Sequence, residues 1–204
     1  STNGKATGEG LALLRGLKRL SSVELVSDKL TDADIEHLAQ VPGLRNLTLA
    51  STGLGEGTPA TLSSITTLAS LNLGLTPISP AGLERLAGLP ELRELNLGSR
   101  RRTAAEFEKL VQFPKLVQLQ LSRADIQDDD LKPLARLEKL QVLQLDATPI
   151  SDAGLEHLAG LHRLLSLDLT ATKVSKEGVK KLQDRLPMCR IRTSLDLPMP
   201  ADQP

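Results

Sequence analysis

The chain has 204 residues with 25 basic and 25 acidic side chains, and aromatic residues make up 1% of it. The balanced charge excludes a strongly basic footprint for nucleic acid or for an anionic membrane surface. The single cysteine excludes an internal disulfide framework, and no apolar run approaches the length of a membrane span. The core must therefore be aliphatic and mostly leucine.

Residues 1–19 precede the first regular unit. We expect the first six residues to be loose, and Thr7–Leu11 to begin a half unit in which Leu14 and Leu17 continue a helix. This helix is predicted to cap the N-terminal end of the core. The chain begins with Ser1 rather than Met, as expected of a mature segment or of a fragment of a larger protein, so its compartment stays open.

Seven leucines recur at a spacing of 24 residues: Leu20, Leu44, Leu68, Leu92, Leu116, Leu140 and Leu164. A fixed period of this size predicts a stacked array of repeats. In units numbered from this leucine, positions 4 and 6 are apolar, and positions 16, 19 and 22 carry apolar residues such as Leu155, Leu158 and Leu161. The step of two predicts a short strand with one buried face, and the steps of three predict a helix. Residues 20–187 are thus predicted to form seven strand–turn–helix units.

Helix-capping residues support this division of each unit. Ser79 precedes Pro80, Ser151 precedes Asp152, and Thr31–Asp34 has the spacing of a capping box. Because strands pack closer together than helices do, stacking the units bends the array. The predicted fold is an α/β solenoid, a curved horseshoe with a parallel sheet on the concave face and helices on the convex face.

Residues Leu140–Leu161 carry the whole pattern, Leu-x-x-Leu-x-Leu-x-x-Thr-x-Ile-Ser-Asp-x-Gly-Leu-x-x-Leu-Ala-x-Leu. On this pattern the chain resembles the leucine-rich repeat family over about residues 7–193, and within it the bacterial units with a helical convex side. The resemblance implies a leucine-rich repeat solenoid and a role in protein recognition or as a structural part of a larger protein. The family often has Asn at position 9, where this chain has Thr52, Thr76, Thr148 and Thr172. Because a hydroxyl makes fewer hydrogen bonds than an amide, we expect less rigid turns.

Three glycines follow the second predicted strand, in Gly53–Gly57, and a phosphate-binding loop has a similar composition. However, Leu54 falls at a core position, the spacing is not GxGxxG, and we expect Pro59 to disrupt the following helix. An irregular convex turn is the favoured interpretation.

Residues Arg100–Arg102 break the pattern at the centre of the array. Arg102 occupies position 11, where the other units have Leu, Ile or Val. Because burying an unpaired guanidinium costs several kcal/mol, we expect this turn to swing outward while Phe107 and Phe113 fill the core. On this interpretation, Arg102→Ile is neutral or stabilising. With Arg123, the cluster is either a solvated variant turn or a basic protrusion that binds an acidic partner.

The concave face is predicted to carry positions 3, 5 and 7 of each strand. In its middle it is neutral and rich in amides, and its predicted contact residues are Asn72, Glu94, Asn96, Gln118, Gln120 and Gln144. These side chains either hydrogen-bond to one another along the sheet or contact a ligand. Together with Arg100, Arg101, Arg102 and Arg123 they form the predicted partner-binding site.

The remaining polar clusters favour structural roles. Asp128–Asp130 falls at a predicted helix start, where negative charge is favoured, so we expect capping rather than a cation site. The three histidines lack metal or catalytic spacing and are expected on the surface. No acid, base and nucleophile converge, so no enzyme activity, cofactor or metal is predicted.

Residues 188–193 are predicted to form a closing edge strand and residues 194–204 an extended tail. Cys189 and Ile191 are expected to face inward, and Arg190 to lie beside Asp168. The exposed arginines of this strand guard its edge against pairing.

The sequence thus predicts a monomeric, non-catalytic protein-interaction module. It binds a protein, with an acidic surface as the favoured kind of partner, through the concave face and adjacent loops, and it binds neither nucleic acid nor membrane. The alternative is a structural spacer or scaffold segment of a larger protein, with no ligand of its own.

Overall fold

A computed structural model describes residues 8–26, 30–50, 54, 55 and 57–195. The strands in these residues are β1 (Ser22–Glu24), β2 (Asn46–Thr48), β3 (Ser70–Asn72), β4 (Glu94–Asn96), β5 (Gln118–Gln120), β6 (Val142–Gln144), β7 (Ser166–Asp168) and β8 (Arg190–Arg192). The α-helices are α1 (Gly8–Ala12), α2 (Asp32–Ile35), α3 (Thr58–Ser63), α4 (Pro80–Leu86), α5 (Ala104–Leu110), α6 (Asp152–Glu156) and α7 (Lys176–Arg185). Three 3-10 helices complete the elements: η1 (Leu13–Gly16), η2 (Leu38–Gln40) and η3 (Asp128–Arg136).

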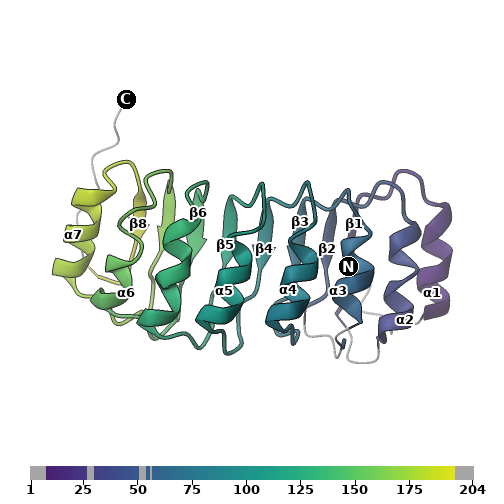
Figure 1. Ribbon diagram of the computed structural model, residues 1–204, viewed down its shortest axis with the longest axis horizontal. Helices are drawn as coiled ribbons and strands as arrows, with labels where there is room; N and C mark the ends of the chain where they lie inside the picture. The colour runs from purple at the N-terminus through teal and green to yellow at the C-terminus, as the bar shows by residue number, and fades with distance from the viewer. Residues whose placement is uncertain (1–7, 27–29, 51–53, 56, 196–204) are drawn as a thin grey trace.

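The strands form one open parallel sheet whose order, from β1 to β8, is their order in the chain. Each strand pairs with the next at an offset equal to the sequence period, as in Leu47↔Leu71 and Leu119↔Leu143. Figure 1 shows the helices side by side in one layer over a single face of this sheet. The predicted α/β solenoid is therefore confirmed.

The core lies between the sheet and the helix layer. The residues at positions 4 and 6 of each unit, all leucine except Val23, are buried, as are Phe107 and Phe113 beneath the central helix. Cys189 closes the core at the C-terminal end, where burial raises the pKa of its thiol to about 12. The thiol therefore stays protonated and unreactive at neutral pH.

The first helix is shorter than predicted. Leu11 is buried in α1, but η1 ends at Gly16 and Leu17 is 50% exposed. The N–H of Leu17 donates to the carbonyl of Leu14 in a tight closing turn. Leu17 therefore does not continue the helix.

The closing strand β8 keeps the regular offset. Cys189 and Ile191 are buried, as expected, but Asp168 pairs with Arg192 and not with Arg190. The Arg192 guanidinium lies 3.4 Å from the Asp168 carboxylate. The prediction of the Arg190 neighbour was wrong because Leu186, although buried, does not begin a shifted repeat.

A left-handed residue follows each of the strands β3 to β7, at position 8. These residues, with φ between 54° and 65°, are Leu75, Ser99, Arg123, Ala147 and Ala171. In the middle of the array their N–H groups donate to the position 7 carbonyl of the next unit, as from Ser99 to Ser122 at 2.8 Å. Each of these central turns therefore adds one more backbone hydrogen bond between neighbouring units beyond the end of the strands.

Candidate functional site

The turn that follows β4 contains the three consecutive arginines. Its backbone is tied to the next unit, since Arg101 forms a parallel bridge with Asp125 and the Arg102 N–H donates to the Asp125 carbonyl at 3.2 Å. Ser99 has the same left-handed conformation as the residues at position 8 of neighbouring units. The turn therefore lies in line with its neighbours and does not swing outward.

Arg102 fills its core position as a buried cation. Its side chain is 2% exposed, its Nη1 donates to Oε1 of Glu106 at 2.8 Å, and Glu106 is itself buried. The other carboxylate oxygen of Glu106 accepts from the N–H of Thr103 at 2.9 Å and completes a capping box. The expected outward turn was wrong because Glu106, one turn along α5, supplies the missing counter-charge. Arg102 is consequently not available to a partner.

Arg102 also makes a hydrogen bond that, in two other units, comes from the threonine at position 9. In two later units the position 9 hydroxyl donates to the position 6 carbonyl, from Thr148 to Leu145 at 2.5 Å and from Thr172 to Leu169 at 2.7 Å. In the central unit, Nε of Arg102 donates to the equivalent carbonyl of Leu97 at 2.9 Å. The loss of threonine at position 9, where Arg100 stands, is thus compensated by Arg102 at position 11.

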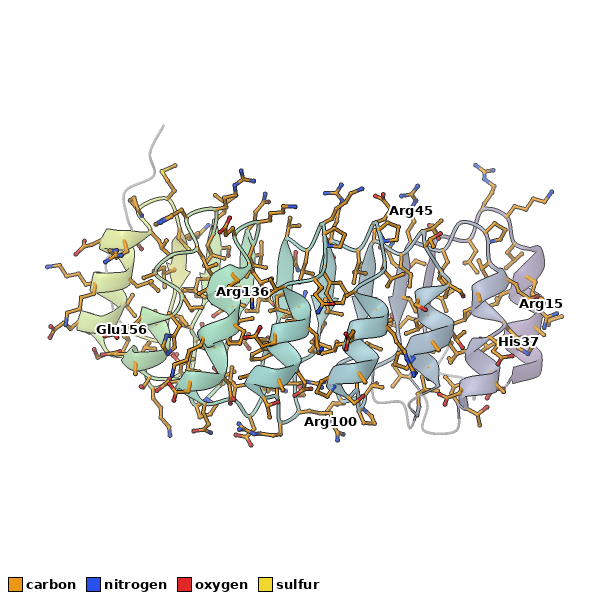
Figure 2. All side chains as sticks on the ribbon, viewed as in Figure 1. Arg15, His37, Arg45, Arg100, Arg136 and Glu156 are labelled. Atoms are coloured by element: carbon orange, nitrogen blue, oxygen red, sulfur yellow. The ribbon has the colours of Figure 1, made fainter. Side chains whose placement is uncertain are left out.

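The other arginines of the cluster differ in their freedom. Arg101 is half exposed, and its Nη1 donates to the Asp125 carbonyl at 2.9 Å and lies 3.2 Å from the Asp130 carboxylate. Arg100 is exposed, with one contact of 3.4 Å to the Leu75 carbonyl. Figure 2 shows Arg100 at the margin of the array where the strands end, opposite Arg45. Arg123 is exposed in the neighbouring turn, so Arg100 and Arg123 are the accessible cations here.

Some amides of the concave face hold the sheet together. Asn72 and Asn96 each accept the N–H two residues later, from Gly74 and Gly98, both at 2.9 Å. The amide of Asn96 also donates to Gln120 at 3.0 Å. For these residues, hydrogen bonding within the sheet is the better of the two interpretations.

The rest of the predicted concave surface faces solvent. Glu94 is exposed at the start of β4, and Gln118 and Gln144 are half-buried on β5 and β6. These strands pair directly, and the loops after β4 and β5 carry Arg100 and Arg123. The structure thus brings three concave side chains and two accessible arginines to neighbouring strands.

The glycine-rich turn after β2 already holds a carboxylate. The N–H groups of Gly55 and Gly57 each donate to Asp32 at 3.1 Å, and the Thr58 hydroxyl donates to the same group. Because Asp32 occupies the place that an anion would take, the turn is structural. Pro59 lies in the first turn of α3 and does not disrupt it, since the first helical N–H groups need no intrahelical acceptor.

Comparisons with known proteins agree with this architecture. A family model described as leucine-rich repeat matches residues 64–87 and 114–135, and no curated protein matches the chain in sequence. The solved structure of internalin C2 from Listeria monocytogenes has a TM-score of 0.67 and 24% identity, over 95% of this chain and 78% of that chain. A leucine-rich repeat protein of Leptospira interrogans has a TM-score of 0.60 and 21% identity, over 92% of this chain and 51% of that chain.

The chain has the leucine-rich repeat fold, and two of its segments match the leucine-rich repeat family model. The left-handed turns, the buried leucine ladders and the helices on one face of the sheet all belong to this architecture.

An aspartate clamp between consecutive leucine-rich repeats was not predicted. Asp128 accepts the N–H and hydroxyl of Ser151 at 2.8 and 2.6 Å, and Asp152 accepts those of Ser175 at 2.7 and 2.6 Å. A Cβ on Gly178 would approach Asp152 to 2.1 Å. The recurring Asp at position 13, with Ser at position 12 of the next repeat, was the available sequence signal. The predicted capping role of the Asp128 cluster thus takes place between repeats as well as within one.

The described part of this leucine-rich repeat array contains no group of three His, Cys, Asp or Glu residues able to hold a metal ion. His157 lies 3.8 Å from Asp129 across two neighbouring helices, and His162 is exposed. None of the helices in the described residues is long and apolar enough to cross a bilayer.

Proposed function

We propose that this leucine-rich repeat array is a non-catalytic interaction module that binds a protein partner. Its binding surface comprises the concave face of β4 to β6 and the loops that follow β4 and β5. The main supporting observation is that Arg100 and Arg123 stay exposed beside Glu94, Gln118 and Gln144, while the neighbouring polar groups are used within the fold.

The composition of this surface indicates the kind of partner. Arginine is among the residues enriched at binding hot spots, and two exposed guanidinium groups complement an acidic patch. Aromatic side chains are scarce in the chain, with two Phe, no Tyr and no Trp, and both Phe are buried. We therefore expect the partner to supply the large apolar anchors and the affinity to be moderate.

Affinity capture from a lysate of the source cells tests this proposal, with the array expected to bind as a monomer. Arg100→Ala with Arg123→Ala, or Gln118→Ala with Gln144→Ala, is expected to remove the partner captured by the wild type. The matched control is Lys132→Ala with Arg136→Ala, which removes the same number of charges from the exposed helical face. Equal capture by the Arg100/Arg123 variant and the wild type would exclude the loops from the site.

The alternative role is that of a structural spacer in a larger protein. Under that alternative, no protein is captured specifically by the wild-type array, and none of the surface substitutions changes the bound fraction. The same capture experiment therefore separates the two roles.

A further inference from the structure

The edge of the sheet at which the strands begin is basic. We use the term basic strip for six exposed residues on this edge: Lys18, Arg19, Arg45, Arg93, Lys139 and Arg163. Glutamates share this edge, among them Glu138 and, at the start of β4, Glu94, while Glu91 is paired with Lys115 at 2.6 Å. Figure 2 shows Arg45 at this margin, with basic side chains extending from the same margin along the array. The overall charge of zero therefore hides a local excess of positive charge.

Helix capping does not account for the basic strip. Cations favour helix C-termini, which lie on this edge, but the effect falls off within the last turn. α4 ends at Leu86 and η2 at Gln40, so Arg93 and Arg45 lie well beyond that range. Lys139 does have a structural contact, since its Nζ donates to the Pro114 carbonyl at 2.8 Å.

The opposite edge provides the contrast. Its aspartates are engaged in the fold, since Asp32, Asp128 and Asp152 all accept hydrogen bonds from the next repeat. Within the part of the chain that the structure describes, no such network holds Arg45 or Arg93. The pKa of Glu91 is lowered by its hydrogen bond and charge interaction with Lys115, with smaller contributions from Arg93 and Arg45. These cations therefore act on one shared region of the surface.

We infer that the basic strip is a docking site for an extended acidic polypeptide segment, distinct from the concave surface proposed above. From β1 to β7 the strip spans about 29 Å at the usual strand spacing, and an extended segment of about nine residues has this length. The charge complementarity is distributed along a line, as suits a segment with several Asp or Glu residues.

Two observations favour polypeptide over other polyanions. Both phenylalanines are buried, so the strip has no aromatic platform on which nucleic-acid bases stack. Exposed apolar side chains stand at its C-terminal end, where Leu165 is 53% and Met188 is 70% exposed. An acidic peptide with an apolar residue can contact both, whereas a sulfated or phosphorylated polymer has no group to cover them.

A fluorescein-labelled peptide of about nine glutamates with a leucine at one end, followed by fluorescence anisotropy, tests this site. The wild type is expected to bind it with an affinity that falls as salt rises. Arg45→Glu with Arg93→Glu is expected to weaken binding by about tenfold or more. The control, Lys132→Glu with Lys180→Glu, makes the same charge change on the exposed helices η3 and α7 and is expected to alter binding less than about twofold.

Competition distinguishes the polymer class, and circular dichroism confirms that each variant is folded. Arg45→Gln with Arg93→Gln is used if the charge-reversed variant fails to fold. The site is overturned by absent peptide binding or by equal loss in the control variant. It is also overturned if a heparin oligosaccharide, a ten-residue oligothymidylate or phosphatidylserine vesicles bind more tightly than the peptide. Loss of peptide binding in Arg100→Glu with Arg123→Glu, without loss in Arg45→Glu with Arg93→Glu, would also overturn the strip and place peptide binding at the concave surface.

Discussion

The central repeat, residues 92–115, and the regular repeat, residues 140–163, solve the same structural problem with opposite chemistry. Their turns are alike, with φ of 65° at Ser99 and 54° at Ala147. At position 11 the regular repeat buries Ile150 at 0% exposure and the central repeat buries Arg102 at 1%. One slot thus accepts an aliphatic side chain or a cation without a visible change of the backbone.

The difference shows what this slot requires. The slot is filled in both repeats, and in both the carbonyl at position 6 receives a side-chain hydrogen bond. In the regular repeat Ile150 fills the slot while Thr148 donates to Leu145. In the central repeat Arg102 does both, with Glu106 neutralising its charge.

Glu106→Ala is expected to have the largest effect on stability. It leaves the Arg102 guanidinium buried without a counter-charge and removes the capping box of α5. Breaking one partner of a buried pair costs about 3–5 kcal/mol, which chemical denaturation followed by circular dichroism measures. An unfolding midpoint equal to that of the wild type would show that Arg102 leaves the core.

A double-mutant cycle sharpens this comparison. Arg102→Ile alone is now expected to destabilise, which reverses the sequence-based prediction, because it leaves Glu106 unpaired. Arg102→Ile with Glu106→Ala is expected to recover most of the loss, since apolar groups can replace a buried pair. Adding Arg100→Thr restores the hydroxyl at position 9 and is expected to recover the remainder. Additive losses in the double variant would contradict the coupling.

Leu121→Ala tests the feature that the two repeats share, the buried leucine ladder. Leu121 is 0% exposed, so its truncation is expected to cost about 2–5 kcal/mol. Gln120, the control, lies on the concave side and is not part of the hydrophobic core. Because it accepts one hydrogen bond from Asn96, Gln120→Ala is expected to cost about 1 kcal/mol or less. Equal losses in the two variants would mean that the strand faces are assigned wrongly.

The fold and the concave face were predictable because they depend on a period. Leu47, Leu71 and Leu119 occupy equivalent positions, so the strand register follows directly from spacing. The state of Arg102 depends instead on a partner outside the repeat pattern, Glu106, which occupies a position that is glycine in Leu140–Leu161. Arg102 at position 11, Glu106 four residues later and the missing Thr at position 9 together indicated a buried ion pair. Taken one at a time, each is only an irregularity in the repeat.

Asp152→Ala tests the clamp, which the central repeat lacks because Ala104 stands at the equivalent position. Its removal leaves the N–H and hydroxyl of Ser175 without the carboxylate, and a loss of about 1–2 kcal/mol is expected. Asp184→Ala, an exposed change on α7, is the control and should change stability by about 0.5 kcal/mol or less. Hydrogen exchange at α7 should rise in the first variant only. Unchanged exchange at α7 in Asp152→Ala would show that packing alone joins these repeats.

Ala147→Gly is expected to have the smallest effect and tests whether the left-handed turn, common to both repeats, is strained. An L-residue in this region costs about 1–2 kcal/mol relative to the right-handed form, whereas glycine loses about 0.5–1 kcal/mol more in chain entropy on folding. A net stabilisation of about 0–1.5 kcal/mol follows, measured from the shift in denaturation midpoint. Ala153→Gly makes the same change inside α6, where it should destabilise by about 1 kcal/mol. Opposite signs at positions six residues apart would show that turn strain is local, whereas destabilisation by both would mean that the turn tolerates alanine without strain.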